Sequence, residues 1–292
     1  MLNDDMKSFI SLALQEDVGS GDVTSESSVP ADLSQKGYIL AKENGVLAGI
    51  EVAREVFFQV NPLIRFTSNI EDGGPVKFGD VVIELEGPAR DILTGERLAL
   101  NFMQRMSGIA TRTAEVVKTL EGTPTQVLDT RKTTPGLRAF EKQAVVLGGG
   151  VNHRMGLYDM ILLKDNHVDF AGSMEGAIHQ VAQYLRDRAP DLPSLPLVVE
   201  TRSFTEIEDA ISASVKSGVS IERILLDNFN PEKVSEAVEK YSHLVCLEAS
   251  GGITPANVRG YGEAGVDFVS MGYMTHSVKS LDLSLKSTTH VK

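Results

Sequence analysis

The sequence predicts an α/β protein whose larger part is a β/α barrel. After about residue 126, short apolar segments alternate with helical patterns along the 292-residue chain. Alternating units of this kind build parallel sheets. The segments are rich in Leu and β-branched residues, as strands buried on both faces are. Before about residue 105, half-buried strand patterns mix with helices. A doubly wound open sheet is the alternative to a barrel.

The first region begins with an amphipathic helix. Residues 35–48 and 81–85 then alternate between apolar and polar side chains as strands do, and residues 50–60 form a helical pattern between them. The apolar face of the N-terminal helix consists of Leu2, Met6, Phe9, Ile10 and Leu14.

A long helical pattern covers residues 94–120, where apolar side chains recur every three or four positions. Thr94 is the expected N-cap and Gly122 the expected terminator. Arg97 would then lie in the first turn, where the helix dipole disfavours a cation. An anion near Arg97 would explain this placement.

Six strands are predicted in the second region, and helix-start signals follow several of them. Ser203 with Glu206 forms a capping-box pattern, and Pro231 and Pro255 each follow a capping residue at the start of a helix. The predicted strands are residues 126–129, 159–164, 197–200, 223–227, 244–248 and 266–270.

Polar residues or glycines stand at the C-terminal ends of these strands. In a β/α barrel, that rim is where catalytic side chains converge, so a binding site explains the pattern better than solvation does. The glycine-containing loops at 249–257 and 270–277 resemble the phosphate cradle of barrel enzymes. The strand-end residues are Asp129, Arg131, Lys132, Lys164, Asp165, Glu200, Asp227, Ser250 and Gly272.

Charge is distributed unevenly. Residues 130–167 hold six Lys and Arg residues against three acids, a local balance of +3, in a chain of net charge −12. A cationic pocket in an acidic protein indicates a small polyanion, and arginine forks suit carboxylate or phosphate. Nucleic acid needs a broad basic face, which this composition disfavours. Solvated surface cations are the alternative explanation.

Several function classes are disfavoured. The single cysteine, Cys246, lies in an apolar strand pattern, which predicts a buried structural thiol, and no Cys/His spacing suits a resident metal. The sequence has no run of about 18 apolar residues, so no membrane span is expected. The first residues carry acids where a signal peptide needs cations, so we expect a cytoplasmic protein.

Four stretches strongly resemble the quinolinate phosphoribosyltransferase family: residues 95–111, 129–167, 247–254 and 269–277. The resemblance covers essentially the whole chain. It implies an N-terminal α/β sandwich domain at 1–110, an open α/β barrel at 111–275, and a tail at 276–292 that returns to the first domain. It also implies a homodimer with shared active sites, with a higher oligomer left open. The chain departs from the family pattern by a longer segment at 189–196.

The resemblance also implies a reaction. Quinolinate takes phosphoribosyl from phosphoribosyl pyrophosphate and loses a carboxylate, giving nicotinate mononucleotide, pyrophosphate and carbon dioxide in de novo NAD synthesis. Both substrates are polyanions, as the charge pattern requires. A transferase for a related pyridine carboxylate and a non-catalytic phosphate-sugar-binding barrel are the alternatives.

The roles of individual residues follow from charge and resemblance together. Lys132, Lys164, Glu200 and Asp227 are the expected catalytic residues. The quinolinate carboxylates would be bound by Arg131, Lys132, His153 and Arg154, with Arg97 added from the partner subunit. Lys164 would meet the pyrophosphate or the ring. Glu200 and Asp227 would hold ribose hydroxyls or a substrate-borne magnesium ion. The 5-phosphate would be cradled by Ser250, Gly251, Gly252 and Gly272, and Ser270 is a further substrate-binding residue. Asp227 as a turn residue beside Asn228, and His153 as a satisfied core histidine, are the structural alternatives.

Overall fold

The computed structural model describes residues 2–188 and 195–288, so most of the longer segment expected at 189–196 lies outside the described residues. The chain divides into two compact units. The first comprises residues 1–115, 133–149 and 274–292, and the second comprises 116–132 and 150–273. Residues 133–149 pack with the first unit, and the domain ranges expected from the sequence, 1–110 and 111–275, stay a prediction.

An antiparallel sheet forms the centre of the first unit, with strand order β12-β1-β5-β3. The last strand returns from the C-terminal tail and pairs along the first, with Gly37 opposite Ser287 and Ala41 opposite Leu283. A separate two-stranded sheet joins β2 to β4. The strands are β1 (Ser34–Ala41), β2 (Gly45–Val46), β3 (Arg65–Ser68), β4 (Pro75–Val76), β5 (Val81–Pro88) and β12 (Leu283–Ser287).

Helices complete the first unit, and the N-terminal amphipathic helix forms as predicted, with Met6 and Ile10 buried. Phenylalanines from three helices share one core. The ring of Phe140 lies 4.9 Å from that of Phe102 and 5.7 Å from that of Phe9, centroid to centroid. The helices are α1 (Asp4–Val18), α2 (Val23–Ser28), α3 (Ile50–Val60), α4 (Ala89–Thr119) and α5 (Arg138–Leu147).

The long helix α4 begins earlier than the sequence predicts. It starts at Ala89, directly after Pro88 ends β5, so Thr94 is not its N-cap. The Thr94 hydroxyl instead donates to the carbonyl of Arg90, one turn back, as threonines inside helices do. Arg97 therefore lies in the third turn, beyond the reach of the N-terminal dipole. The electrostatic argument for an anion at Arg97 was wrong.

Six parallel strands form the sheet of the second unit, in the order β6-β11-β10-β9-β8-β7. From β7 to β11 each strand pairs with the next one along the chain, and β11 closes onto β6. This single direction of winding is that of a barrel, since a doubly wound sheet reverses its strand order. Within the described residues β6 and β7 do not pair, so the barrel is open. The strands are β6 (Gln126–Leu128), β7 (Ile161–Leu163), β8 (Leu197–Thr201), β9 (Arg223–Asp227), β10 (Cys246–Ser250) and β11 (Phe268–Ser270).

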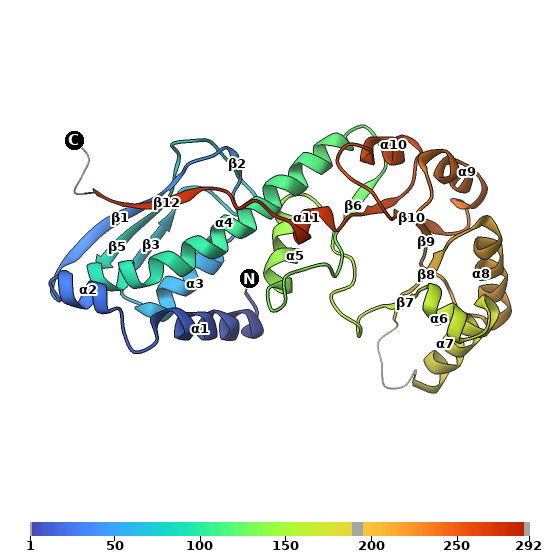
Figure 1. Cartoon of the computed structure of the whole chain (residues 1–292), viewed down its shortest axis with the longest axis horizontal. Helices are drawn as coiled ribbons and strands as arrows, with labels where there is room; N and C mark the ends of the chain where they lie inside the picture. The colour runs from blue at the N-terminus through green and yellow to red at the C-terminus, as the bar shows by residue number, and fades with distance from the viewer. Residues whose placement is uncertain (1, 189–194, 289–292) are drawn as a thin grey trace. The chain divides into compact units, whose positions relative to one another are not determined.

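Helices cover the outer side of this sheet, where Figure 1 shows α7, α8 and α9 alongside the strands. All six predicted strands are confirmed, with ends shifted by a few residues. The helices are α6 (Asp165–Phe170), α7 (Met174–Arg188), α8 (Phe204–Ser217), α9 (Pro231–Tyr241), α10 (Val258–Glu263) and the short α11 (Tyr273–His276) at the boundary between the units.

The helix-start signals are confirmed at α9 and in part elsewhere. The Asn230 side chain accepts from the N–H of Lys233 and caps α9. Ser203 caps α8 through the N–H of Glu206, but the Glu206 carboxylate accepts from the N–H of Arg202, so the capping box is not reciprocal.

The last predicted helix starts late. The Asn257 side chain accepts from the N–H of Thr254 and holds residues 254–257 in a turn, so α10 begins at Val258 rather than at Pro255. The prediction of a buried thiol at Cys246 was also wrong. Cys246 is exposed, because it is the first residue of β10 and lies at the N-terminal end of the strand. No helix within the described part of the chain is long and apolar enough to cross a membrane.

Candidate active site

The candidate site lies at the C-terminal rim of the barrel sheet. Because the six strands are parallel and paired in register, their last residues meet along one edge. Residues 129–132 follow β6, Lys164 follows β7, and Glu200 stands one residue before the end of β8. The strands β9, β10 and β11 end at Asp227, Ser250 and Ser270.

Two guanidinium groups lie close enough to repel each other at this rim. Arg131 is exposed and Arg154 is partly buried. Burial and the charge of Arg131 lower the pKa of Arg154, and the carboxylate of Asp159 only partly offsets them. Like charges held together at the edge of a barrel are suited to binding an anion, since a bound anion would relieve their repulsion.

A mixed cluster stands at the ends of β7, β8 and β9. Glu200 is half-buried, and burial raises its pKa. The ammonium group of Lys164 works in the opposite direction, while the carboxylates of Asp227 and Asp165 raise the pKa further. The backbone N–H of Asp165 also donates to Glu200. Two rim carboxylates beside one lysine are suited to a magnesium-bound phosphate and its sugar hydroxyls.

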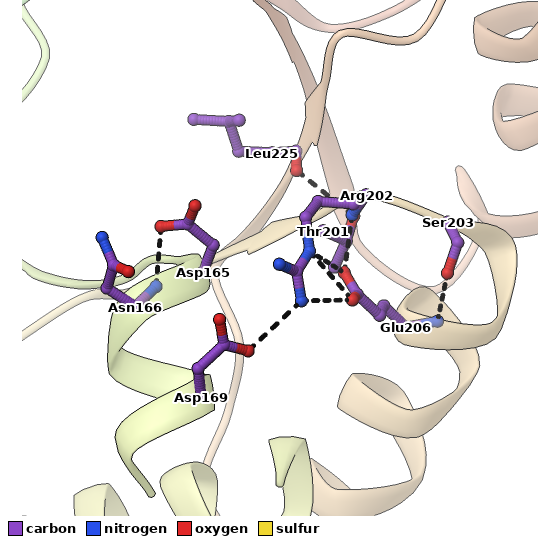
Figure 2. A network of polar contacts seen from close by, with 8 residues as sticks. All are labelled: Asp165, Asn166, Asp169, Thr201, Arg202, Ser203, Glu206 and Leu225. Carbon is purple, nitrogen blue, oxygen red and sulfur yellow. Dashed lines mark hydrogen bonds and ion pairs between the residues drawn. The ribbon is translucent and has the colours of Figure 1, made fainter. Parts of the chain in front are cut away.

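A surface network supports the elements that carry this cluster (Figure 2). The Arg202 guanidinium lies 2.8 Å from the Glu206 carboxylate and 3.6 Å from that of Asp169. It therefore links α6, which follows Lys164, to the loop that follows Glu200. The Arg202 side chain is 43% exposed, so each contact contributes little to stability. The Arg202 contacts mainly fix the position of α6 relative to the loop after Glu200.

The loops after β9 and β10 are joined through Asn228. Its N–H donates to the carbonyl of Ser250 at 2.8 Å, and its side-chain amide donates to Asp227 at 2.8 Å. Gly251 has a φ of +93°, and a Cβ there would overlap the Asn228 amide. Gly252 also has a positive φ, of +63°, but faces open space. Gly251 is thus needed for contact within the protein, while Gly252 leaves room for a ligand.

His153 is held on both sides of its ring. Its side chain is 8% exposed, and Nδ1 accepts from the N–H of Arg154 at 2.7 Å. Nε2 lies 3.5 Å from a carboxylate oxygen of Glu248. The backbone N–H of His153 donates to buried Asp129 at 2.8 Å. These contacts match the satisfied core histidine that the sequence left open, and a direct contact with substrate stays a prediction.

A buried ion pair beside His153 was not predicted from the sequence. Glu248, in the middle of β10, is 0% exposed, and its carboxylate lies 2.7 Å from the guanidinium of Arg223 in β9. Burial acts to raise the pKa of Glu248, but His153, Arg223 and a hydrogen bond from Ser270 together hold it below its ordinary value. The available signal was a carboxylate in the otherwise apolar strand CLEAS.

The remaining predicted residues are distributed as follows. Lys132 is exposed in the loop after β6, where its backbone N–H donates to the Thr130 hydroxyl. Ser270 is buried at the end of β11, and Gly272 follows two residues later. Arg97 is exposed on α4, which belongs to the first unit. The structure thus brings together Arg131 with Arg154, and Lys164 with Glu200 and Asp227.

No resident metal centre is evident in residues 2–188 and 195–288, because no group of three or more His, Cys, Asp or Glu side chains there is placed to hold an ion. Glu200 and Asp227 still suit a magnesium ion carried by a substrate. Magnesium keeps several waters and takes one or two carboxylates together with substrate phosphates.

Comparisons with known proteins agree over nearly the whole chain. The model of the quinolinate phosphoribosyl transferase N-terminal domain matches residues 22–107, and that of the C-terminal domain matches residues 109–286. Quinolinate phosphoribosyltransferase [decarboxylating] 1b of Nicotiana tabacum is 41% identical over 98% of this chain and 83% of its own length. The probable nicotinate-nucleotide pyrophosphorylase [carboxylating] of Bacillus subtilis (strain 168) is 38% identical over 97% of this chain and 93% of its own.

A solved structure shows the same likeness in three dimensions. The nicotinate-nucleotide pyrophosphorylase from Francisella tularensis is 35% identical and superposes with a TM-score of 0.90. The match covers 99% of this chain and 98% of that one.

Proposed function

This chain belongs to the quinolinate phosphoribosyltransferase family, and we propose that it carries out the family's decarboxylating transfer at the C-terminal rim of its barrel. The observation that supports this most directly is the pair of like-charged guanidiniums, Arg131 and Arg154. Beside them on the same rim stand a lysine and two carboxylates. One rim thus offers a subsite for a dicarboxylate and another for a magnesium-bound sugar phosphate.

Quinolinate fits the arginine pair because it carries carboxylates on adjacent ring carbons. Each guanidinium can donate two parallel hydrogen bonds to a carboxylate, which fixes the plane of the ring as well as its position. The lowered pKa of Arg154 belongs to the unliganded site, and a bound dianion would raise it again. Lys132 and His153 are the further expected contacts.

Phosphoribosyl pyrophosphate fits the rest of the rim. Lys164 would bind the pyrophosphate, and Glu200 with Asp227 would hold the ribose hydroxyls and a magnesium ion that the pyrophosphate brings with it. The loop of Gly251 and Gly252 would receive the 5-phosphate, because no atom outside Gly252 and its chain neighbours lies within 4 Å of where a Cβ of Gly252 would stand, which leaves room for a phosphate beside the backbone.

The transfer needs no covalent bond to the protein. The pyridine nitrogen bonds to the anomeric carbon of the ribose while the bond from that carbon to pyrophosphate breaks, and pyrophosphate leaves with the electron pair. Positive charge on the anomeric centre is favoured by Glu200 and Asp227 nearby. The cationic ring then loses its neighbouring carboxylate as carbon dioxide, and that ring carbon takes a proton from solvent. The product is nicotinate mononucleotide.

A direct assay tests this function. Purified protein is mixed with quinolinate, phosphoribosyl pyrophosphate and magnesium, and pyrophosphate and carbon dioxide are followed together. We expect one carbon dioxide per pyrophosphate, no turnover in excess chelator, and no metal that survives dialysis. Nicotinate in place of quinolinate is the control for a related pyridine acid. Binding of both substrates without release of pyrophosphate would instead favour a non-catalytic barrel.

We also propose a homodimer in which Arg97 of one chain completes the site of the other. The support is the exposure of Arg97 on α4 and the family resemblance of residues 95–111. In a twofold dimer, each site would take Arg97 from one subunit and Arg154 from the other.

Mixed dimers test this arrangement. Arg97→Ala and Arg154→Ala homodimers should each be nearly inactive. After unfolding and random reassembly, half of the dimers are mixed, and each mixed dimer has one intact site and one doubly damaged site. The mixture should recover about a quarter of wild-type activity. No recovery, with mixed dimers confirmed by mass spectrometry, would show that Arg97 and Arg154 act in one chain's site.

A cytoplasmic location is a further proposal. Relatives from Nicotiana glauca and rice carry the words mitochondrial and chloroplastic in their names, so family membership leaves the compartment open. Cell fractionation with antibody detection distinguishes the cytoplasm from an organelle.

A further inference from the structure

We propose that Glu248 is a positioning residue for the dicarboxylate substrate: it orients the His153 ring, which in turn fixes the backbone of Arg154. This inference rests on the proposed function for the identity of the substrate, but the positioning itself is a property of the unliganded chain. Glu248 lies in the middle of β10, below the rim, and contacts His153 and Ser270 of the candidate site.

The first step is the contact between Glu248 and His153. The Glu248 side chain is 0% exposed and one of its oxygens, Oε2, lies 3.5 Å from His153 Nε2 and 2.7 Å from Arg223 Nη1. A buried carboxylate beside a guanidinium stays ionised, so it accepts hydrogen bonds and donates none. The proton of the imidazole therefore belongs on Nε2, facing this oxygen.

The second step is the contact between His153 and Arg154. With the proton on Nε2, Nδ1 is an acceptor, and it accepts from the backbone N–H of Arg154 at 2.7 Å. The opposite tautomer would place two N–H groups against each other there. The N–H of His153 is held by Asp129 as well. The backbone N–H groups of both His153 and Arg154 are therefore held by hydrogen bonds, and these fix the backbone that carries the Arg154 side chain.

A role in folding alone does not account for this arrangement. Replacing both members of a buried ion pair by apolar residues is often neutral or stabilising, so the fold does not require the pair of Glu248 and Arg223 as such. What an apolar residue cannot do is select one tautomer of His153. The consequence should appear in quinolinate binding, since Arg154 is the residue that the chain of contacts reaches.

The test compares Glu248→Leu with Glu248→Gln and with Arg223→Lys. The Gln amide oxygen can still accept from Nε2–H, whereas Leu cannot. Arg223→Lys changes the other member of the ion pair but keeps a cation beside the carboxylate that faces His153, so it is the matched control. We expect Glu248→Leu to raise the KM for quinolinate by about tenfold or more, because small displacements of a binding group have effects of this size. The KM for phosphoribosyl pyrophosphate should stay within about twofold, and Glu248→Gln and Arg223→Lys should keep the quinolinate KM within about threefold.

The tautomer is measured separately by ¹⁵N NMR of the histidine side chains, with His153 assigned from the spectrum of His153→Gln. Wild type should carry the proton on Nε2, and Glu248→Leu should lose that preference. If Glu248→Leu does not fold, Glu248→Asp takes its place, because the shorter side chain withdraws the carboxylate from His153 while keeping its charge.

Two results would overturn the proposal: an unchanged His153 tautomer in the folded variant, or KM values for both substrates that rise together. Should wild type not use quinolinate, the proposed function fails, while the tautomer measurement still decides the positioning role.

Discussion

Two pairs of charged side chains show opposite uses of arginine in this chain. In the first unit, Arg105 meets the buried carboxylate of Glu141, with Nε at 2.8 Å and Nη2 at 2.6 Å. The Thr134 hydroxyl accepts a further bond from Arg105, and its N–H donates to Glu141. In the barrel, the charge of Arg131 acts on Arg154 and helps to lower its pKa, and Asp159 offsets this only in part. The charges of Arg105 and Glu141 balance each other. The like charges of Arg131 and Arg154 do not, and a bound anion would be their counterion.

The difference distinguishes structural charges from binding charges. A buried carboxylate that loses its partner destabilises the fold, because the remaining charge is left without solvent or counterion. Removing one of two repelling cations has no such penalty. Substitutions in the first pair should therefore act on stability, and substitutions in the second should act on substrate.

The largest effect is expected for Arg154→Ala and Arg131→Ala, each measured by kcat/KM for quinolinate. Losing a charge-assisted bidentate contact in a closed site costs roughly 2–4 kcal/mol, or about 30- to 1000-fold. The melting temperature should stay near that of wild type. Arg65→Ala is the control, since Arg65 is 77% exposed in the sheet of the first unit. Near-native kinetics in either barrel variant would remove that arginine from the site.

Arg105→Ala should mainly destabilise the first unit. The substitution leaves the carboxylate of Glu141, whose side chain is 1% exposed, without its counterion. Breaking such a buried pair lowers the free energy of unfolding by about 3 kcal/mol. Denaturant unfolding measures the loss. The double variant Arg105→Met with Glu141→Leu should recover most of it, because no buried charge remains. Equal stability of wild type and Arg105→Ala would place Arg105 among the binding charges.

Lys164→Ala should lower turnover by about 100-fold with little change in melting temperature, since electrostatic groups aimed at a reacting centre have effects of this order. Lys164 is exposed at a strand end and holds no part of the core. Lys216→Ala, at an exposed helix position paired with Glu175, is the matched control. Loss of soluble protein in the Lys164 variant would instead make Lys164 a structural ion-pair partner.

The smallest effect concerns Glu200 and pH. Burial raises its pKa in the folded state above that in the unfolded chain, so the folded form binds this proton more tightly. Ionised Glu200 therefore reduces stability as pH rises above about 4, the ordinary range of a glutamate pKa. Glu200→Gln should melt slightly above wild type at pH 7, and the difference should vanish below about pH 4.

The size of this effect is limited because Glu200 is only half-buried and solvent screens its charge. The same variant should lose activity, since its carboxylate is expected at the ribose and magnesium. A higher melting temperature that persists at pH 3 would assign the gain to packing rather than to ionisation.

The elements of the barrel could be predicted from local sequence, because their signals are local. A strand buried on both faces needs a short apolar run, and the residue after its C-terminal end faces solvent and ligand. Lys164 and Asp227 were recognisable on these grounds alone. The parallel order of the strands then brings them to one rim, whatever the details of packing.

Errors arose where a residue's role depends on what surrounds it. Threonine is a residue type that often caps helices, which favoured Thr94 as the N-cap. Because β5 ends at Pro88 and α4 begins at Ala89, Thr94 lies inside the helix. Cys246 has apolar neighbours in sequence but opens its strand at an exposed end. Local composition cannot report distant packing of this kind.

The sequence by itself therefore determined the α/β barrel, the excess of cations in residues 130–167, and the residues that stand at the strand ends of the candidate site. Only the tertiary structure decided how those charges are paired. Glu141 and Glu248 are both buried glutamates, and the sequence alone does not reveal that Glu141 meets Arg105 and that Glu248 meets Arg223 and His153. Pairing depends on distances of a few ångströms between segments far apart in sequence, because the energy of a buried charge is set by its nearest partners.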